Sequence, residues 1–153
     1  MKKSLRLIVF TAIAAMLCFS SCTKDPEKLI VGKWKVVSAR CSDQNYGDAV
    51  ENDKGTTWNF KENGTFTGTM NIMDFIGSDI SCNYTCDDSS LELRGGDLKG
   101  TFDGESYNIV YMFDIDEISR KELSISGKVK ISDTYDGYTD TYSFSVSYDL
   151  EKK

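Results

Sequence analysis

The sequence predicts an all-β protein, a small up-and-down antiparallel β-barrel of about eight strands. Three observations lead to this fold class. Apolar and polar residues alternate with a period of two after Gly32, turn signals separate the alternating segments, and no segment after residue 21 has a convincing helical period. Sequential antiparallel strands at this spacing also suit a sandwich. We favour the barrel, because it closes the sheet edges through which all-β chains aggregate.

The first 21 residues are predicted to be a lipoprotein signal peptide. Three basic residues precede an apolar run over 7–19, which is shorter than a typical transmembrane helix. The run ends in Phe-Ser-Ser-Cys, which resembles a bacterial lipobox and implies that Cys22 is lipidated and becomes the mature N-terminus. An ordinary secretory signal that happens to lie near a cysteine is the alternative. A lipid anchor on Cys22 would hold the protein at a membrane of the cell envelope.

Residues 22–31 are expected to be the lipidated cysteine and a flexible linker, because they are short, polar and contain the only proline. The segment Lys24-Asp25-Pro26-Glu27 faintly resembles acidic export signals of outer-membrane lipoproteins, so display on the periplasmic face and on the cell surface both stay open. Without residues 1–21 the chain has 15 basic and 24 acidic residues, a net charge of −9. Such an acidic body is a poor partner for nucleic acid.

Residues 32–153 are predicted to be one barrel domain. Strands are expected near 33–40, 56–61, 65–72, 79–86, 90–94, 97–102, 106–116, 121–132 and 139–150. Asn63-Gly64 between alternating arms predicts a hairpin, since both residues tolerate positive φ. Further turns are expected at 95–97, 103–104, 116–120 and 133–137. Residues 72–78 suit either a short helix or a strand end.

A family resemblance adds to this pattern. Gly32-Lys33-Trp34 resembles the Gly-x-Trp signature of lipocalins, and Thr57-Trp58 through Gly68 resembles the second hairpin of bacterial lipocalin-like lipoproteins. The resemblance implies an eight-stranded barrel whose base Gly32 and Trp34 close. In lipocalins an arginine near the last strand stacks on that tryptophan. This chain has no arginine there, and Lys152 is the residue that could substitute in part.

Three cysteines remain after Cys22, namely Cys41, Cys82 and Cys86, in a compartment that permits disulfides. In one extended strand the Cα atoms of Cys82 and Cys86 would be about 13 Å apart, whereas a disulfide needs less than about 7 Å. Either the strand breaks at Asn83-Tyr84, or Cys41 pairs with Cys82 or Cys86. We favour a disulfide that includes Cys41.

The sequence favours a binding or interaction protein over an enzyme. It contains no histidine, which excludes imidazole acid–base chemistry and Ser-His-Asp triads, and no cofactor or metal motif is present. Carboxylate groups such as Asp133, Asp136 and Asp140 lack the spacing of a calcium loop.

The aromatic residues on the expected inner faces of the strands are the main candidates for a ligand cavity. They are Tyr107, Tyr111, Tyr142, Phe144 and Tyr148. An eight-stranded barrel either fills its interior or holds one small ligand. The first hypothesis is therefore an envelope lipoprotein whose barrel binds a small apolar or amphipathic ligand. The alternative is an accessory protein with a filled barrel that contacts another envelope protein.

Overall fold

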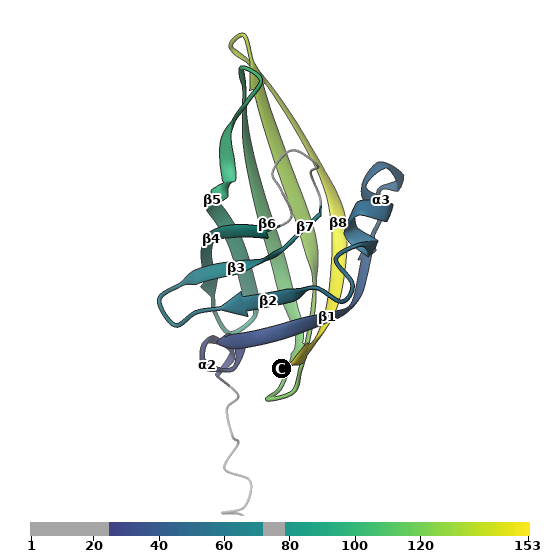
Figure 1. Cartoon of the computed structure of the whole chain (residues 1–153), viewed down its shortest axis with the longest axis vertical. Helices are drawn as coiled ribbons and strands as arrows, with labels where there is room; N and C mark the ends of the chain where they lie inside the picture. Colours follow the sequence, from purple (N-terminus) through teal and green to yellow (C-terminus); the bar gives the residue numbers. More distant parts are fainter. Residues whose placement is uncertain (1–24, 72–78) are drawn as a thin grey trace, which may run out of the picture.

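The computed structural model describes residues 25–71 and 79–153 of the chain. In this part, eight antiparallel strands form a closed barrel in which each strand pairs with the next and β8 pairs with β1 (Figure 1). The predicted up-and-down barrel is confirmed. The predicted signal peptide, Cys22 and the ambiguous segment 72–78 lie outside the described residues. The strands are β1 Gly32–Cys41, β2 Thr57–Phe60, β3 Thr65–Thr69, β4 Asp79–Cys86, β5 Ser90–Phe102, β6 Glu105–Ile118, β7 Glu122–Tyr135 and β8 Tyr138–Lys152.

The turns between strands follow the glycine signals of the sequence. In the β2–β3 hairpin Gly64 has φ 77° and donates its N–H to the Lys61 carbonyl, whereas Asn63 stays outside the positive-φ region. The loops Asp103-Gly104 and Asp136-Gly137 each have positive φ at both residues. That geometry belongs to two-residue hairpins whose twist matches the flanking strands.

Strand β5 corrects one expectation. Two strands over 90–94 and 97–102 were predicted, with a turn at Gly95-Gly96, but the structure has one strand with a shift of register between Arg94 and Lys99. Both glycines have positive φ, so the local chain makes a β-bulge rather than a reversal. The two glycines signal left-handed backbone, and whether that backbone turns or bulges depends on the neighbouring strand.

Residues 26–30 correct a second expectation. They were predicted to be linker but form the short helix α2, Pro26–Ile30. Pro26 is at the start of the helix, where its fixed φ suits the first turn and its missing N–H costs nothing. Ile30 is completely buried. The helix is therefore held by packing against the barrel, which composition alone does not reveal.

Helix α3, Gln44–Glu51, was not predicted at all. Asp43 caps it by accepting a hydrogen bond from the Asn45 N–H at 2.8 Å. Only Val50 of its eight residues is fully buried, so the segment lacks the repeated apolar positions by which a helix is found in sequence. No helix in the described ranges has the length and apolar character to cross a membrane.

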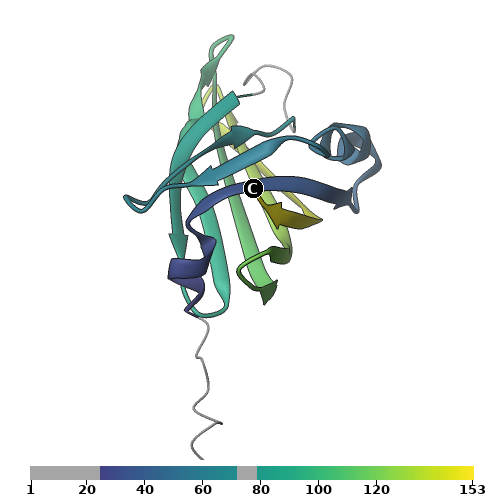
Figure 2. The ribbon, with the colours of Figure 1, turned by 60° about the horizontal axis from the view of Figure 1, so that its bottom comes forward.

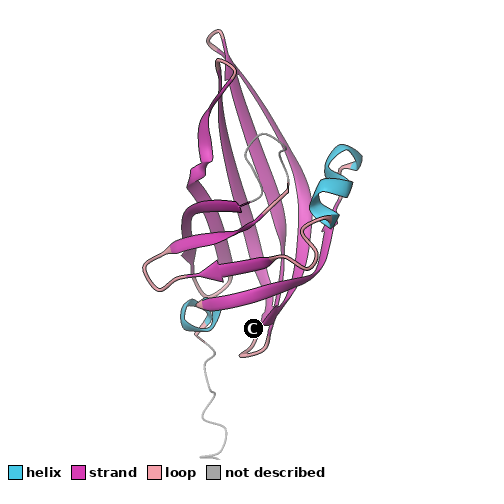
Figure 3. Ribbon diagram, viewed as in Figure 1, coloured by secondary structure: helices cyan, strands magenta, loops and turns pink. Residues whose placement is uncertain are grey.

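The strands differ greatly in length, and this gives the barrel two unlike ends. β2 and β3 have four and five residues, whereas β6, β7 and β8 have 14, 14 and 15. Figures 1 and 3 show the result: α2, the β6–β7 turn and the C-terminus lie at one end, and the long β5–β6 and β7–β8 hairpins extend beyond the short strands at the other. We call these the closed end and the mouth. Figure 2 shows α3 at the end of β1 remote from α2.

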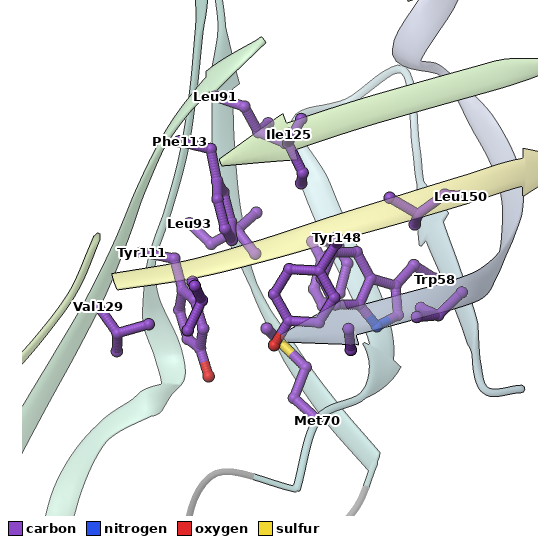
Figure 4. Close-up of a cluster of buried hydrophobic side chains, with 14 of the residues drawn as sticks. Trp58, Met70, Leu91, Leu93, Tyr111, Phe113, Ile125, Val129, Tyr148 and Leu150 are labelled. Atoms are coloured by element: carbon purple, nitrogen blue, oxygen red, sulfur yellow. The ribbon is translucent and has the colours of Figure 1, made fainter. Parts of the chain in front are cut away.

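The interior is rich in aromatic side chains, which supply large apolar contact areas. Trp58 lies 5.5 Å from Phe66 and 4.7 Å from Tyr148 between ring centroids. Figure 4 shows Trp58 and Tyr148 together with aliphatic side chains from β5, β7 and β8. The fully buried members include Trp34, Trp58, Phe60, Phe66, Leu91, Leu93, Ile109, Tyr111, Ile125, Val129 and Ile131.

Candidate functional site at the barrel mouth

Trp34 lies at the closed end and is completely buried. Its indole N–H donates to the Ile30 carbonyl at 2.7 Å, which ties α2 to the barrel. The Lys152 ammonium lies 4.2 Å from the centroid of the indole ring and donates to the carbonyls of Leu29 and Val31. Lys152 thus makes the cation–π contact that the family resemblance led us to expect of it.

Gly32 explains the first half of the Gly-x-Trp signature. It has φ 125°, in a region of backbone that residues with a side chain rarely adopt, and an added Cβ would lie 3.0 Å from Cε and Nζ of Lys152. Glycine therefore lets the lysine lie against the chain beneath Trp34. Both signature residues serve the closed end and neither contacts the mouth.

Helix α3 borders the mouth through one aromatic residue. The Tyr46 ring stacks on Phe144 with 4.6 Å between centroids and lies 6.0 Å from the Tyr142 ring. Its hydroxyl donates to the Tyr142 hydroxyl at 2.9 Å. Burial raises the pKa of Tyr142 above its usual value. The helix therefore orients Tyr142 at the rim, an arrangement that joins parts of the chain 96 residues apart.

A buried carboxylate, Asp53, lies inside the barrel and has no exposed surface. One oxygen accepts hydrogen bonds from the backbone and side-chain N–H groups of Asn71, at 2.7 and 2.9 Å. The other accepts from the Tyr148 hydroxyl at 2.9 Å. Burial raises the pKa of Asp53 from 3.8 to about 6, although these three donors act in the opposite direction.

The Tyr111 hydroxyl lies near this carboxylate but has no partner. It is the one buried side-chain oxygen or nitrogen in the described residues without a hydrogen bond. Burial, reinforced by the negative charge of Asp53, holds the pKa of Tyr111 well above its usual range, and the same holds for Tyr148. Figure 4 shows the two tyrosine hydroxyls pointing to the same side of the cluster. An unpaired buried hydroxyl costs about 1–3 kcal/mol.

The five aromatic residues predicted to line a cavity occupy three levels of the barrel. Tyr111 and Tyr148 are deep in the core, and Phe144 is buried nearer the mouth. Tyr142 and Tyr107 are half-buried at the rim. The Tyr107 ring lies over Gly100, whose added Cβ would approach its hydroxyl to 2.7 Å. These five residues therefore form a stripe from core to rim rather than one pocket.

Beyond the rim the long hairpins carry exposed aromatic residues. The exposed fractions are 53% for Phe102, 64% for Tyr135 and 80% for Tyr138. Large apolar side chains that gather at one place on a surface mark interaction sites more often than scattered ones do. The mouth thus continues outward as an aromatic face, which we call the hairpin face and define by residues 100–107 and 133–142.

The cysteines correct a further expectation, because Cys41, Cys82 and Cys86 are all free thiols. A disulfide from Cys41 to Cys82 or Cys86 was predicted, but β1 and β4 are not neighbours in the barrel. β2 and β3 separate them on one side. Cys82 and Cys86 share the unbroken strand β4, so the extended spacing that argued against their pairing applies.

A groove of about 760 Å³ crosses the outer side of the barrel. It runs along the row in which Glu92 pairs with Met112, Met112 with Lys128 and Lys128 with Ser145. Arg40 and Asp114 also line it. The groove has charges of both signs and one exposed methionine, which is a surface suited to protein contact rather than to a buried ligand.

Sequence reasoning missed Asp53, Asn71 and Tyr46. Asp53 lies in Asn-Asp-Lys-Gly, a string typical of a solvated turn, and nothing in that string signals a buried carboxylate. Tyr46 is on the helix that was not predicted. The alternation that identified Tyr111 and Tyr148 could not reveal the partners that reach them from outside the strands.

The family comparison agrees with this architecture. Residues 30–125 match the model of the lipocalin-like domain, a range that begins at the end of α2 and reaches into β7. Neither the curated proteins nor the solved structures contain a significant match to the chain. The match covers more than half of the chain and includes Gly32, Trp34 and the β2–β3 hairpin. The chain therefore belongs to the lipocalin-like domain family.

Proposed function

We propose that this protein is a lipid-anchored envelope protein whose lipocalin-like barrel binds a small apolar or amphipathic ligand at its mouth. The observation that carries the proposal is the continuity of the inner aromatic stripe with the exposed hairpin face. Side chains from Tyr148 to Tyr138 follow one face of β8 from the core into solvent. A ligand that covers this face would remove apolar surface from water at about 25 cal/mol per Å².

The anchor is a separate part of the proposal and rests on the sequence. Cys22 follows an apolar run and two serines, and lipidation there would place the barrel a few residues from an outer membrane, on its periplasmic face or on the cell surface. The test is incorporation of labelled palmitate into the full chain and into Cys22→Ala, followed by membrane fractionation. Equal labelling of the two proteins would reject Cys22 as the site.

Binding rather than catalysis is proposed because the chemical groups at the mouth suit recognition. The sequence lacks histidine, and the carboxylate of Asp53, whose pKa is raised to about 6, is enclosed by its own hydrogen-bond donors. Aromatic faces and hydroxyl groups orient a ligand without transforming it.

Native mass spectrometry of residues 23–153 tests the proposal, because this range contains every described helix and strand. A bound small molecule released on unfolding supports ligand binding. Phe102→Ala/Tyr138→Ala should retain less of that molecule. Val37 borders Glu122 and Leu123 next to the β6–β7 turn, so Val37→Ala should retain it in full. A protein that is always empty and binds no amphiphile would contradict the proposal.

The outer groove favours a second candidate function, an accessory role in which the barrel contacts another envelope protein. Crosslinking in intact cells distinguishes the two. A stoichiometric protein partner that is lost in Met112→Glu but kept in Phe102→Ala/Tyr138→Ala would favour the accessory role. The reverse pattern would favour the mouth.

A further inference from the structure

The hairpin face is a direct extension of the barrel interior, and strand register defines which residues share it. Residues directly opposite each other in an antiparallel pair lie on the same face of the sheet. Ile109, which is fully buried, pairs with Ile131, and Ile131 pairs with Tyr142. The next inward-facing row, two residues farther from the core, consists of Gly100, Tyr107, Asp133 and Asp140. The outermost row joins Phe102 to Glu105 and Tyr135 to Tyr138.

This face is acidic and has no basic counterpart. Its charged members are Asp103 and Asp136 in the two turns and Glu105, Asp133 and Asp140 in the inward-facing rows. None of the ion pairs found in the described residues involves these five carboxylates. Asp133 and Asp140 are directly opposite each other. Like charges in that position destabilise a sheet, by an amount comparable to the 0.2–1 kcal/mol that favourable pairs contribute. A cation placed between them would remove the repulsion.

Aromatic rings flank the carboxylates on both sides. Tyr107 pairs with Asp133, and Tyr142 is close enough for its hydroxyl to interact with the Asp133 carboxylate. On the solvent side, Tyr135 and Tyr138 are 64% and 80% exposed. Tyrosine faces attract organic cations through the quadrupole of the ring, and carboxylates strengthen the attraction.

The geometry suits an organic cation better than a metal ion. No group of three or more carboxylate or thiol side chains in the described ranges is placed to hold a metal. The acidic residues are spread over two rows of the sheet with rings between them. An ammonium group that carries an apolar chain matches both features, because the charge satisfies the carboxylates while the chain covers the exposed aromatic rings of the face.

We propose that the hairpin face binds the ammonium head group of a cationic amphiphile between Asp133, Asp140 and the surrounding tyrosine rings. This inference rests on the proposed ligand-binding function and names the charge class of the ligand. The exposed rings of Phe102, Tyr135 and Tyr138 provide the apolar contact for the chain of the amphiphile. A net charge of −9 on the chain after residue 21 further attracts cations to the protein.

The experiment compares three probes of equal chain length on residues 23–153. Decyltrimethylammonium, decyl maltoside and decyl sulfate carry a positive, a neutral and a negative head group, and each is titrated calorimetrically below its micellar concentration at physiological salt. We expect the cationic probe to bind at least about tenfold more tightly than the neutral one. The anionic probe should bind most weakly.

A pair of charge-matched variants shows where the cation binds. Asp133→Asn/Asp140→Asn removes two charges from the face, and Asp116→Asn/Glu117→Gln removes two charges near the β6–β7 turn at the closed end. The first variant should lose at least about tenfold in affinity for the cationic probe and keep its affinity for the neutral probe. The second should change neither. The melting temperature of the first variant should not fall, because it removes a repulsion.

The outcomes separate the two proposals. Equal binding of the cationic and neutral probes, or equal losses in the two variants, would overturn the cationic inference and leave small-ligand binding standing. Binding of none of the three probes would overturn both. If Asp133→Asn/Asp140→Asn loses affinity for the cationic probe alone, the result supports both small-ligand binding and the cationic inference.

Discussion

Trp34 is held at the closed end of the barrel by three kinds of contact: burial of its ring, a hydrogen bond to Ile30 and the Lys152 ammonium over its face. We predict that Trp34→Ala lowers the free energy of unfolding by about 3–5 kcal/mol, because it removes a large buried aromatic side chain. Urea unfolding measures the change. Tyr138→Ala, at an 80% exposed aromatic, is the control and should stay within about 0.5 kcal/mol of the native protein. Equal losses in the two variants would contradict this placement of Trp34.

Asp53 makes stability depend on pH in an unusual direction. Its pKa is raised from 3.8 to about 6 on folding, so between these values the folded protein holds a proton that the unfolded chain has released. The contribution of this group to stability is therefore full below pH 3.8 and falls as the pH rises through 6. A difference of about two between the pKa values of Asp53 in the folded and unfolded states corresponds to about 3 kcal/mol in the free energy of unfolding.

The variant Asp53→Asn isolates this effect, because the amide keeps an acceptor oxygen but carries no charge. We predict that its free energy of unfolding, relative to that of the native protein, increases by up to about 3 kcal/mol between pH 4 and pH 7. Urea unfolding at several pH values gives this difference directly, since other titrating groups cancel. A difference that does not change with pH would show that Asp53 has an ordinary pKa.

At the scale of elements, the bulge in β5 depends on Gly96. This residue has φ 56°, and an added Cβ would lie 2.2 Å from the Ser81 carbonyl oxygen of the neighbouring strand. We predict that Gly96→Ala destabilises the protein by about 1–3 kcal/mol through overpacking and backbone strain. Thermal unfolding followed by circular dichroism measures the loss.

Helix α3 offers the matched control for that substitution. Gly47 is inside the helix, and an added Cβ would meet nothing within 4 Å. Gly47→Ala should therefore raise stability, by about 0.4–1 kcal/mol, because alanine loses less conformational entropy in a helix. If the two alanine variants shift the melting temperature in the same direction, the bulge at Gly96 is not as tight as described.

At the scale of the whole molecule, closure of the barrel holds residues 25–71 and 79–153 together without a disulfide among them. We predict that a reducing agent leaves the melting temperature unchanged, because Cys41, Cys82 and Cys86 are free. Denatured residues 23–153 should react with three equivalents of a thiol reagent. The folded protein should react slowly at Cys82 and Cys86, since burial raises the pKa of each thiol to about 12. Fewer than three reactive thiols after denaturation would indicate a disulfide.

Local pattern determined the strand content of this protein. The alternation at Tyr142, Phe144, Val146 and Tyr148 corresponds to the inner face of β8, and the same period predicted which face of β6 carries Tyr111. These assignments were possible because side chains of a strand alternate between two faces regardless of what lies across the sheet. Gly32 and Trp34 could likewise be assigned to the first strand from their short motif.

Tertiary structure alone decided the features that depend on contacts between distant segments. The Gly95-Gly96 backbone forms a bulge because β6 continues past it. Residues 26–30 form a helix because the Ile30 side chain is buried against the barrel. Asp53 is a core residue because Asn71 and Tyr148 donate hydrogen bonds to its carboxylate. The acidic pair Asp133 and Asp140 exists only through the register of β7 and β8. Sequence thus determined the periodicity and the faces of the strands, whereas pairing, burial and the composition of the mouth arose from closure of the barrel, which brings together residues that no local pattern connects.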